Sequence, residues 1–303
     1  MLKFDMNNPL VSVIIVTWNR KDDMLETLDA LQNQTYSNLE VIIVDNGSSD
    51  GTADVIRKKY PNYKLIYLSS NVGCEEGFNV GIVDATGPIL IFLDSDAFFE
   101  DAGIEKIVKK FQADESLGIV DPRIFNFFSN EIQNEPKNWP KDHTMFTGCA
   151  VGVKKEVFNN IGLRPKDYFI YASEPDICIR ALDYGYKIEH CSDILAYHKE
   201  SPTKRLSPKF YYYNTRNVLW LICKYYPLLP AIREILFHFI INFILSLKTL
   251  SIHYYFLGML EGIFKLPLVI KNERKPLEKW YLGRVYPSNM QILRIIISKL
   301  RLT

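Results

Sequence analysis

Four apolar stretches alternate with amphipathic segments in the N-terminal part of the chain. The stretches cover 11–17, 39–45, 64–68 and 89–93. They are short and rich in β-branched and aliphatic residues, which is typical of buried strands. Between the first two, apolar residues recur every three or four positions from Met24 to Leu31, which is the spacing of a helix. Strands that alternate with helices in this way predict a parallel sheet with right-handed crossovers.

The pattern becomes less regular beyond residue 100. Residues 101–117 predict a surface helix, and residues 123–143 lack periodicity and predict a long loop. The segment 147–153 predicts a strand with small side chains, which leave space for a substrate. A further helix is expected to begin near Ser173, because Pro175 suits a first helical turn.

Polar side chains end three of the predicted strands, at Thr17, Asp45 and Asp94. The carboxyl ends of parallel strands meet at one edge of a sheet, and that edge is where ligands bind in open α/β folds. Asp94 and Asp96 repel each other unless a cation neutralises them. Their oxygen atoms suit Mg²⁺ or Mn²⁺, which would in turn hold a diphosphate. An isolated Asp-x-Asp is often only a solvated loop, but the convergence of strand ends favours a metal site.

Glycines 73, 77 and 81 recur every four residues, and they allow two interpretations. Small residues let a helix pack closely on a sheet, and they also let a nucleotide or sugar approach the backbone. The spacing is not the dinucleotide fingerprint, and no Gly-Lys-Ser/Thr loop occurs. Nicotinamide-dependent and P-loop functions therefore lose support.

Further candidate residues lie beyond residue 170. Glu174 is either a helix cap or a general base that takes a proton from an attacking hydroxyl. His198 follows a predicted short strand, and it is either structural or part of a metal or diphosphate site. Arg216 is a further candidate for a diphosphate contact.

The order of these features resembles an inverting family-2 glycosyltransferase of the GT-A fold, similar to rhamnosyltransferases. The resemblance covers about residues 10–200 and is carried by 13–20, 44–52, 71–81 and 92–96. The nucleotide-sugar site that it implies comprises Thr17, Asn19, Arg20, Asp45, Gly73, Gly77, Asn79, Asp94 and Ser95. It also implies that Asp94 and Asp96 form the metal-binding Asp-x-Asp.

One departure from the family pattern concerns the catalytic base. Many members carry a Glu-Asp pair, a second Asp two residues later and then an Arg, whereas this chain has Ser173-Glu174-Pro175-Asp176 before Arg180. Counting back from Arg180 places Glu174 at the position of the base. Glutamate is a competent base but one methylene longer than aspartate, so Asp176 is a second candidate.

The net charge of +1 conceals an asymmetry along the chain. Residues 1–200 carry 20 Lys and Arg against 31 Asp and Glu, and residues 201–303 carry 16 against 4. A basic C-terminal segment of this kind favours an anionic membrane surface or a nucleic acid as partner. The five scattered cysteines have no metal or redox spacing, and no basic and apolar leader begins the chain, so a reducing cytoplasmic location is expected.

The C-terminal segment changes in composition after residue 207, which predicts a catalytic domain over 1–207 and a helical region over 208–303. The runs 235–247 and 249–260 carry no charge, but each is shorter than the roughly 20 apolar residues that a spanning helix needs. We expect them to lie peripherally on the cytoplasmic side of the cell membrane. The alternative is a set of helices that pack on each other or on a second copy. Nucleic acid is disfavoured because the basic residues are interleaved with aliphatic runs.

The sequence therefore predicts a metal-dependent inverting glycosyltransferase. Its donor would be a nucleoside-diphosphate sugar and its acceptor a hydroxyl of a glycan, most simply a lipid-linked one. Two alternatives stay open. A nucleotidyltransferase also uses a metal and an α/β sheet, although the 17–20 segment lacks the usual glycine-rich loop. A non-catalytic subunit that binds sugar nucleotides or glycans is compatible with the unusual run at Ser173-Glu174.

Overall fold

The computed structural model of the chain describes residues 8–134, 144–199, 207–277 and 285. It divides into two compact units. Unit 1 comprises Met1–Pro136, Phe146–Phe169 and Arg180–Thr203, and unit 2 comprises Lys137–Met145, Ile170–Ile179 and Lys204–Thr303. The domain boundary predicted between residues 207 and 208 stays a prediction, and residues 135–143 of the predicted long loop lie outside the described residues.

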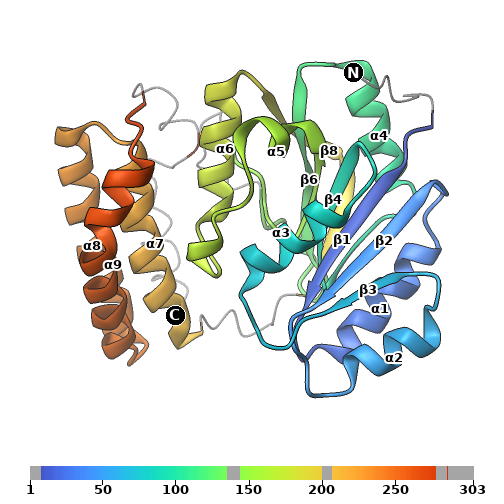
Figure 1. Cartoon of the computed structure of the whole chain (residues 1–303), viewed down its shortest axis with the longest axis horizontal. Helices are drawn as coiled ribbons and strands as arrows, with labels where there is room; N and C mark the ends of the chain where they lie inside the picture. The colour runs from blue at the N-terminus through green and yellow to red at the C-terminus, as the bar shows by residue number, and fades with distance from the viewer. Residues whose placement is uncertain (1–7, 135–143, 200–206, 278–284, 286–303) are drawn as a thin grey trace. The chain divides into compact units, whose positions relative to one another are not determined.

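Unit 1 is built on a sheet whose described strands follow the order β3-β2-β1-β4-β7-β6-β8-β5 (Figure 1). The strands are β1 (Val11–Thr17), β2 (Leu39–Asp45), β3 (Lys64–Tyr67), β4 (Ile89–Asp94), β5 (Ala97–Phe99), β6 (Leu117–Asn126), β7 (Ala150–Lys154) and β8 (Lys187–His198). Strands β1 to β4 pair in parallel, as the sequence predicts. The remaining pairs are antiparallel except for β6 with β8. The predicted α/β class with a mostly parallel sheet flanked by helices is confirmed, and the antiparallel pairs are those made by β5 and β7.

Strands β5 and β6 are absent from the sequence-based expectation. The predicted helix over 101–117 ends at Ala113, and the region expected to be loop from residue 123 still belongs to β6. Pro122 explains the error, because proline is unusual within a central strand. The register of β6 against β8 shifts between Pro122 and Arg123, and this irregularity accommodates the proline. The strand before His198 is likewise longer than expected, since β8 begins at Lys187.

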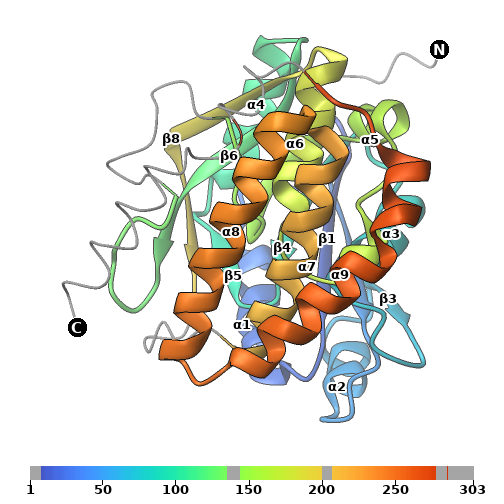
Figure 2. The ribbon, with the colours of Figure 1, turned by 90° about the vertical axis from the view of Figure 1, so that its left-hand side faces the viewer.

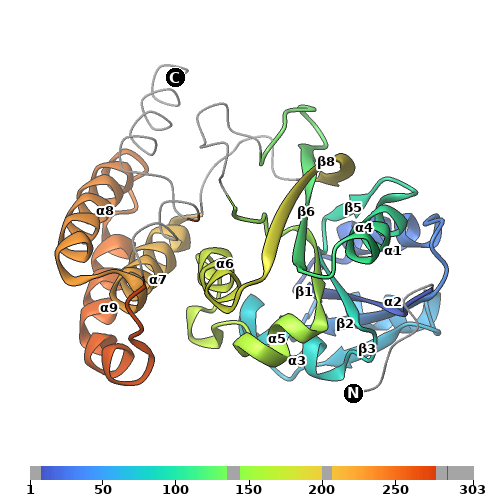
Figure 3. The same ribbon diagram turned by 90° about the horizontal axis from the view of Figure 1, so that it is seen from above.

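The helices of unit 1 cover the two faces of the sheet. Helices α1 (Lys21–Gln32), α2 (Thr52–Lys59) and α4 (Gly103–Ala113) contribute to one apolar core with alternate residues of β1, β2 and β4. Helices α3 (Cys74–Asp84) and α5 (Lys155–Ile161) pack on the opposite face, where Phe78 and Phe158 both meet Phe92 edge-on. Figure 3 shows α3 and α5 on one side of the strands and α1 and α4 on the other.

Strand β4 is deeply buried in this core. Residues 89–93 are each at most 1% exposed. Burial of one such aliphatic or aromatic side chain contributes about 1.5–3 kcal/mol relative to exposure. The strand is therefore held rigidly, and so is the position of Asp94 at its end.

Unit 2 is helical. Helices α7 (Pro208–Tyr225), α8 (Leu228–Lys248) and α9 (Ile252–Glu273) lie side by side (Figure 2), so the predicted C-terminal helical region is present. Helix α6 (Ser173–Tyr184) begins in unit 2 and ends in unit 1, and the short helix η1 (Lys166–Tyr168) precedes it. Among the described residues, α8 alone is long and apolar enough to cross a membrane by length and composition. This differs from the sequence expectation, because the helix extends beyond the uncharged run 235–247 to Leu228.

Candidate active site

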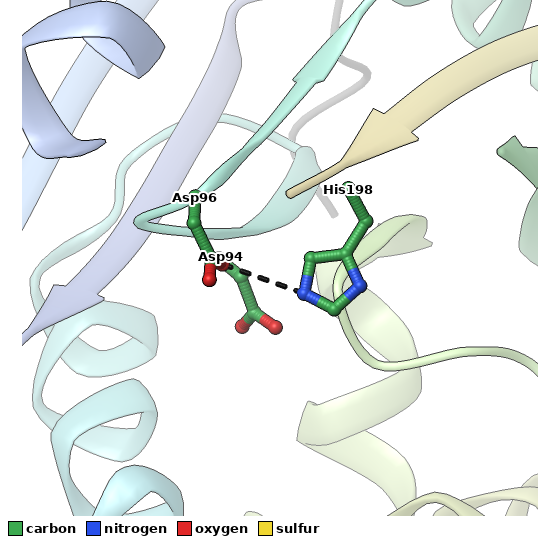
Figure 4. Close-up of side chains that lie close together, drawn as sticks. All are labelled: Asp94, Asp96 and His198. Carbon is green, nitrogen blue, oxygen red and sulfur yellow. Dashed lines mark ion pairs between the residues drawn. The ribbon is translucent and has the colours of Figure 1, made fainter. Parts of the chain in front are cut away.

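Two carboxylates and one imidazole come together at the edge of the sheet in unit 1. Asp94, Asp96 and His198 each offer one ligand atom, and these atoms lie within 4.8 Å of one another (Figure 4). The sheet explains the meeting, because Ala97 of β5 pairs with His198 of β8 and the Lys199 N–H donates to the Asp96 carbonyl at 2.9 Å. Such a mixed oxygen and nitrogen set can hold a divalent cation.

The charge of Asp96 is stabilised by its neighbours. Oδ1 lies 3.4 Å from His198 Nε2, and Oδ2 lies 3.9 Å from Arg20 Nη1. Burial raises the pKa of this carboxyl, but the hydrogen bond to His198 and the charges of His198 and Arg20 outweigh burial and leave the pKa below its ordinary value. Asp96 is therefore ionised at neutral pH and available to a cation.

The ring of His198 is oriented by Gln133, a residue that sequence analysis assigned only to a loop. Its Nδ1 lies 3.1 Å from Gln133 Oε1. An amide oxygen only accepts hydrogen bonds, so Nδ1 carries a proton toward Gln133, and loss of the proton on Nε2 would present that nitrogen's lone pair to a cation. Metal-binding histidines use this arrangement, in which an outer partner sets the tautomer.

Thr17 and Asp45 form a second polar pair, at the adjoining ends of β1 and β2. They are paired in register and both side chains are buried. Asp45 Oδ1 accepts the Ser48 N–H at 2.7 Å. Asp45 Oδ2 and Thr17 Oγ1 have no hydrogen-bond partner in the described part of the chain. A buried polar atom left unpaired costs about 1–3 kcal/mol, so this pair is suited to a polar ligand.

The loops after β1 and β2 are tied together by Asn19. This residue has a left-handed backbone with φ of 52°. Its N–H donates to Ser48 Oγ at 2.9 Å, and its Oδ1 accepts the Ser49 N–H at 2.8 Å. Arg20 is 55% exposed beside it and pairs with Asp23 at 3.0 Å. Asn19 shapes the rim and Arg20 is accessible on it, while their contacts with a nucleotide stay predictions.

Glycines 73, 77 and 81 allow α3 to approach its neighbours closely. A Cβ on Gly77 would lie 2.7 Å from Val16 Cγ1, and a Cβ on Gly81 would collide with Ile14. Gly73 has a φ of +94°, and a Cβ there would lie 2.7 Å from Phe169. These contacts support the packing interpretation. The nucleotide contacts of Gly73 and Gly77 stay predictions.

Asn79 and Ser95 are buried and engaged within unit 1. Asn79 Oδ1 accepts the Arg164 N–H at 2.9 Å, and its Nδ2 donates to the Arg164 carbonyl at 3.1 Å. Arg164 forms a buried ion pair with Glu75 at 2.8 Å. The Ser95 carbonyl accepts the Thr27 hydroxyl at 3.0 Å. Both residues support the surrounding structure, and their predicted roles in binding remain untested.

Glu174 and Asp176, in the first turn of α6, have different surroundings within unit 2. Asp176 is buried, accepts the Tyr225 hydroxyl at 2.9 Å and lies 3.6 Å from Lys224 Nζ. Glu174 is half-buried, and its carboxylate makes no hydrogen bond or ion pair with any described residue. Of the two carboxylates, Glu174 is the one whose oxygens are not already used by its own unit.

Arg216 lies in the interior of unit 2. Its Nη1 is 3.3 Å from Glu261 Oε2 of α9, and its guanidinium carbon lies 4.7 Å from the centre of the Trp220 ring. The contact with Glu261 joins α7 to α9, and the contact with Trp220 lies within α7. The diphosphate contact predicted for Arg216 has no support from them and stays a prediction.

Comparison with known proteins gives consistent matches. The family model described as glycosyl transferase family 2 matches residues 12–176. "Glycosyltransferase AglE" of Haloferax volcanii is 27% identical over 221 residues, which cover 66% of this chain and 70% of that protein. The next four curated relatives are matched over 34% to 55% of their own length.

Two solved structures share the fold of the chain. A mannosyltransferase of Pyrobaculum calidifontis, in complex with GDP-Man and Mn²⁺, has a TM-score of 0.59 at 20% identity and covers 97% of this chain and 87% of its own. Residues 1–349 of S. aureus TarS, in complex with UDP-GlcNAc, have a TM-score of 0.60 at 18% identity and cover 86% of this chain and 82% of their own. At these identities the likeness establishes the fold.

Proposed function

This chain belongs to glycosyl transferase family 2 and is a glycosyltransferase, and from that premise we propose that it moves a sugar from a nucleoside-diphosphate donor to a hydroxyl of a glycan acceptor in a metal-dependent, inverting reaction. The observation that carries the proposal is the cluster of Asp94, Asp96 and His198 at the end of the buried strand β4.

The donor nucleoside would occupy the edge formed by β1 and β2. The unpartnered Thr17 Oγ1 and Asp45 Oδ2 offer a hydroxyl and a carboxylate oxygen to N–H or O–H groups of a base or ribose. The similar structures carry GDP-Man and UDP-GlcNAc, which supports a nucleotide-sugar donor without choosing its base.

The cation of the proposal is Mg²⁺ or Mn²⁺, and the residues present suit either. Asp94 and Asp96 contribute carboxylate oxygens, and His198 contributes a nitrogen held in place by Gln133. When bound, the cation would supply charge stabilisation to the departing diphosphate. Arg20 lies at the same edge and adds a positive charge that the diphosphate can approach.

We assign the general base to Glu174 rather than Asp176. The acceptor oxygen forms its bond to the anomeric carbon while the bond from that carbon to the diphosphate oxygen breaks, and the hydroxyl proton passes to the carboxylate. One displacement inverts the configuration. The assignment rests on the order of residues before Arg180 and on the free carboxylate of Glu174, because Asp176 is buried and paired.

For the acceptor we propose a lipid-linked glycan at the cytoplasmic side of the cell membrane. The exposed apolar residues of α8 and α9 support a site that works beside lipid. The alternative is that these exposed apolar residues form the interface of a homo-oligomer.

The deciding experiment measures release of nucleoside diphosphate from a panel of nucleotide sugars, with Mn²⁺, with Mg²⁺ and with chelator. The wild type should turn over one donor with metal only, and Glu174→Gln should lose at least a hundredfold in kcat while still binding the donor. Asp176→Glu, which keeps the charge, is the matched comparison. Donor binding without turnover by the wild type would favour the non-catalytic subunit, and full activity of Glu174→Gln would remove Glu174 from the base role.

A further inference from the structure

From Glu234 to Ser246, helix α8 buries its polar side chains inside unit 2 and exposes many of its apolar ones, while Arg233 and Lys248 lie exposed near its two ends. Its buried polar residues are Glu234, His238, Asn242 and Ser246. They recur every four positions and so form one row along the helix. A helix on the surface of a water-soluble domain has the opposite arrangement, with apolar residues inward and polar residues outward.

The inward row is satisfied by partners within unit 2. Asn214 of α7 donates to Asn242 Oδ1 at 3.3 Å, and Asn242 Nδ2 donates to the His238 carbonyl at 2.9 Å. The Ser246 hydroxyl donates to the Phe243 carbonyl at 2.8 Å. The bond from Asn214 joins the polar side of α8 to α7, so this side is packed, whereas apolar side chains on the other side of the helix are exposed.

The outward apolar residues continue from α8 onto α9. We call them the α8–α9 face: Leu228, Leu229, Ile232, Leu236, Ile240, Phe243, Ile244, Leu247, Leu250, Phe256, Leu257, Leu260, Ile263, Phe264, Leu268 and Ile270, each at least 38% exposed. Exposed apolar side chains gathered along two neighbouring helices of this length mark an interaction site.

Helix α9 packs on α7 through small residues. A Cβ on Gly258 would collide with the Tyr212 carbonyl, and a Cβ on Gly262 would lie 3.1 Å from Leu219. Glycines four residues apart let two helix backbones approach closely, as they do where large apolar side chains face lipid instead of the helix partner. The glycine side of α9 thus faces inward, and its large apolar side chains remain outside.

We propose that the α8–α9 face inserts into the hydrocarbon of one leaflet of a bilayer that contains anionic lipid. The inverted polarity of α8 is the arrangement that lipid requires, because polar groups must be satisfied within the protein and apolar groups face the acyl chains. A protein partner would instead be expected to meet polar groups at the rim of the surface.

The charges of the C-terminal region favour binding to a membrane that contains anionic lipid. In α8 and α9, Glu234 pairs with Arg233, Glu261 pairs with Lys265 and Arg216, and Glu273 pairs with Lys224. The carboxylates are thereby neutralised, and residues 201–303 carry an excess of 12 positive charges. Each basic residue near an anionic surface adds about 1 kcal/mol of attraction.

Insertion into one leaflet fits the helices better than crossing the bilayer. The α8 and α9 helices are joined by a short turn around Leu250, so α9 would have to return across the membrane if α8 crossed it. The middle of α9 carries the Glu261 and Lys265 pair, and charged groups are costly at the centre of a bilayer. A Lys side chain in a helix that lies in the leaflet can extend to the headgroups. This inference does not depend on the proposed reaction.

Flotation of the full-length protein with vesicles tests the inference. Vesicles of phosphatidylcholine with 30% phosphatidylglycerol should carry the wild type to the top of the gradient and retain it in 1 M NaCl. The double variant Leu236→Glu with Ile240→Glu should bind at least tenfold less. Val83→Glu is the control, because it places a carboxylate on a 72% exposed apolar site of unit 1 and should float like the wild type.

Circular dichroism and the thermal midpoint establish that each variant is folded, and light scattering gives its oligomeric state. Equal flotation of the double variant would overturn the inference, as would release of the wild type by 1 M NaCl, because that outcome indicates surface charge alone. A wild-type dimer that ignores vesicles and dissociates in the double variant would assign the face to a second copy. If flotation holds while no donor is turned over, the proposed reaction fails and the membrane inference stands.

Discussion

His198 Nδ1 lies 3.1 Å from the side-chain oxygen of Gln133, which leaves Nε2 facing Asp96 Oδ1 at 3.4 Å. Gln133 thereby orients the ring so that Nε2 is the nitrogen that would bind a metal, although Gln133 need not touch the metal itself. The contact between His198 and Gln133 joins β8 to the segment after β6. Gln133 thus supports a candidate metal ligand from outside the site.

Substitution at Gln133 should change metal affinity. Gln133→Leu removes the acceptor for Nδ1–H and should weaken Mn²⁺ binding about 10–100-fold, measured by electron paramagnetic resonance of free Mn²⁺. Gln133→Glu keeps an acceptor and should retain wild-type affinity or exceed it. Equal affinity of the Leu variant would show that Gln133 does not orient the ring.

Thr17→Val should separate stability from binding. The buried hydroxyl has no described partner, so its replacement by an isosteric methyl should leave the free energy of unfolding unchanged or raise it by about 1 kcal/mol. If the hydroxyl also forms a hydrogen bond with a bound nucleotide, the affinity of the variant for that nucleotide should fall about tenfold. Urea unfolding and calorimetric titration with UDP and GDP measure the two quantities. A large loss of stability would mean that the hydroxyl has a structural partner.

Asp96 should make the stability of the metal-free protein depend on pH. Its pKa is lower in the folded state, because its contacts with His198 and Arg20 outweigh the effect of burial, which alone raises it. The stabilisation is complete above the unfolded pKa of about 3.9 and is lost as pH falls through the lower folded pKa. Asp96→Asn should thus lower the free energy of unfolding at pH 7, and the difference from wild type should shrink below pH 4. A difference independent of pH would contradict the shift.

Gly77→Ala should destabilise unit 1. The new Cβ would lie 2.7 Å from Val16, and overpacking of this kind costs about 1–3 kcal/mol. Val83→Ala on the same helix is a control, because an exposed position should change the free energy of unfolding by less than about 0.5 kcal/mol. Urea unfolding compares them. If Gly77→Ala is neutral in stability but loses donor affinity, the glycine serves the ligand and not the packing.

Asp176→Asn should act on stability, unlike Glu174→Gln. Asp176 is buried against Tyr225 and Lys224, so loss of its charge should cost about 1–3 kcal/mol. Glu174 has no described polar partner, so its neutral variant should unfold within about 0.5 kcal/mol of wild type. Urea unfolding of both variants decides which carboxylate is structural. Similar destabilisation by both would remove the argument for Glu174 as the free base.

The order of apolar and polar residues along the chain was sufficient to predict the parallel strands β1 to β4. The runs that form β1, β2 and β4 are apolar at successive positions, so both faces of each strand are buried. Each strand ends at a polar residue, which is Thr17 in β1, Asp45 in β2 and Asp94 in β4. These features depend only on neighbouring residues, so they can be predicted without tertiary information.

Contacts between distant segments decided the composition of the candidate metal site, the path of β6 and the orientation of α8. The register of β5 with β8 brings His198 to Asp96, and no local pattern encodes a pairing between segments so far apart. Strand β6 contains Pro122, and the shift in its register against β8 accommodates this proline. The direction in which each side of α8 faces depended likewise on its contacts with α7, because apolar residues along a helix do not reveal whether protein or lipid will cover them.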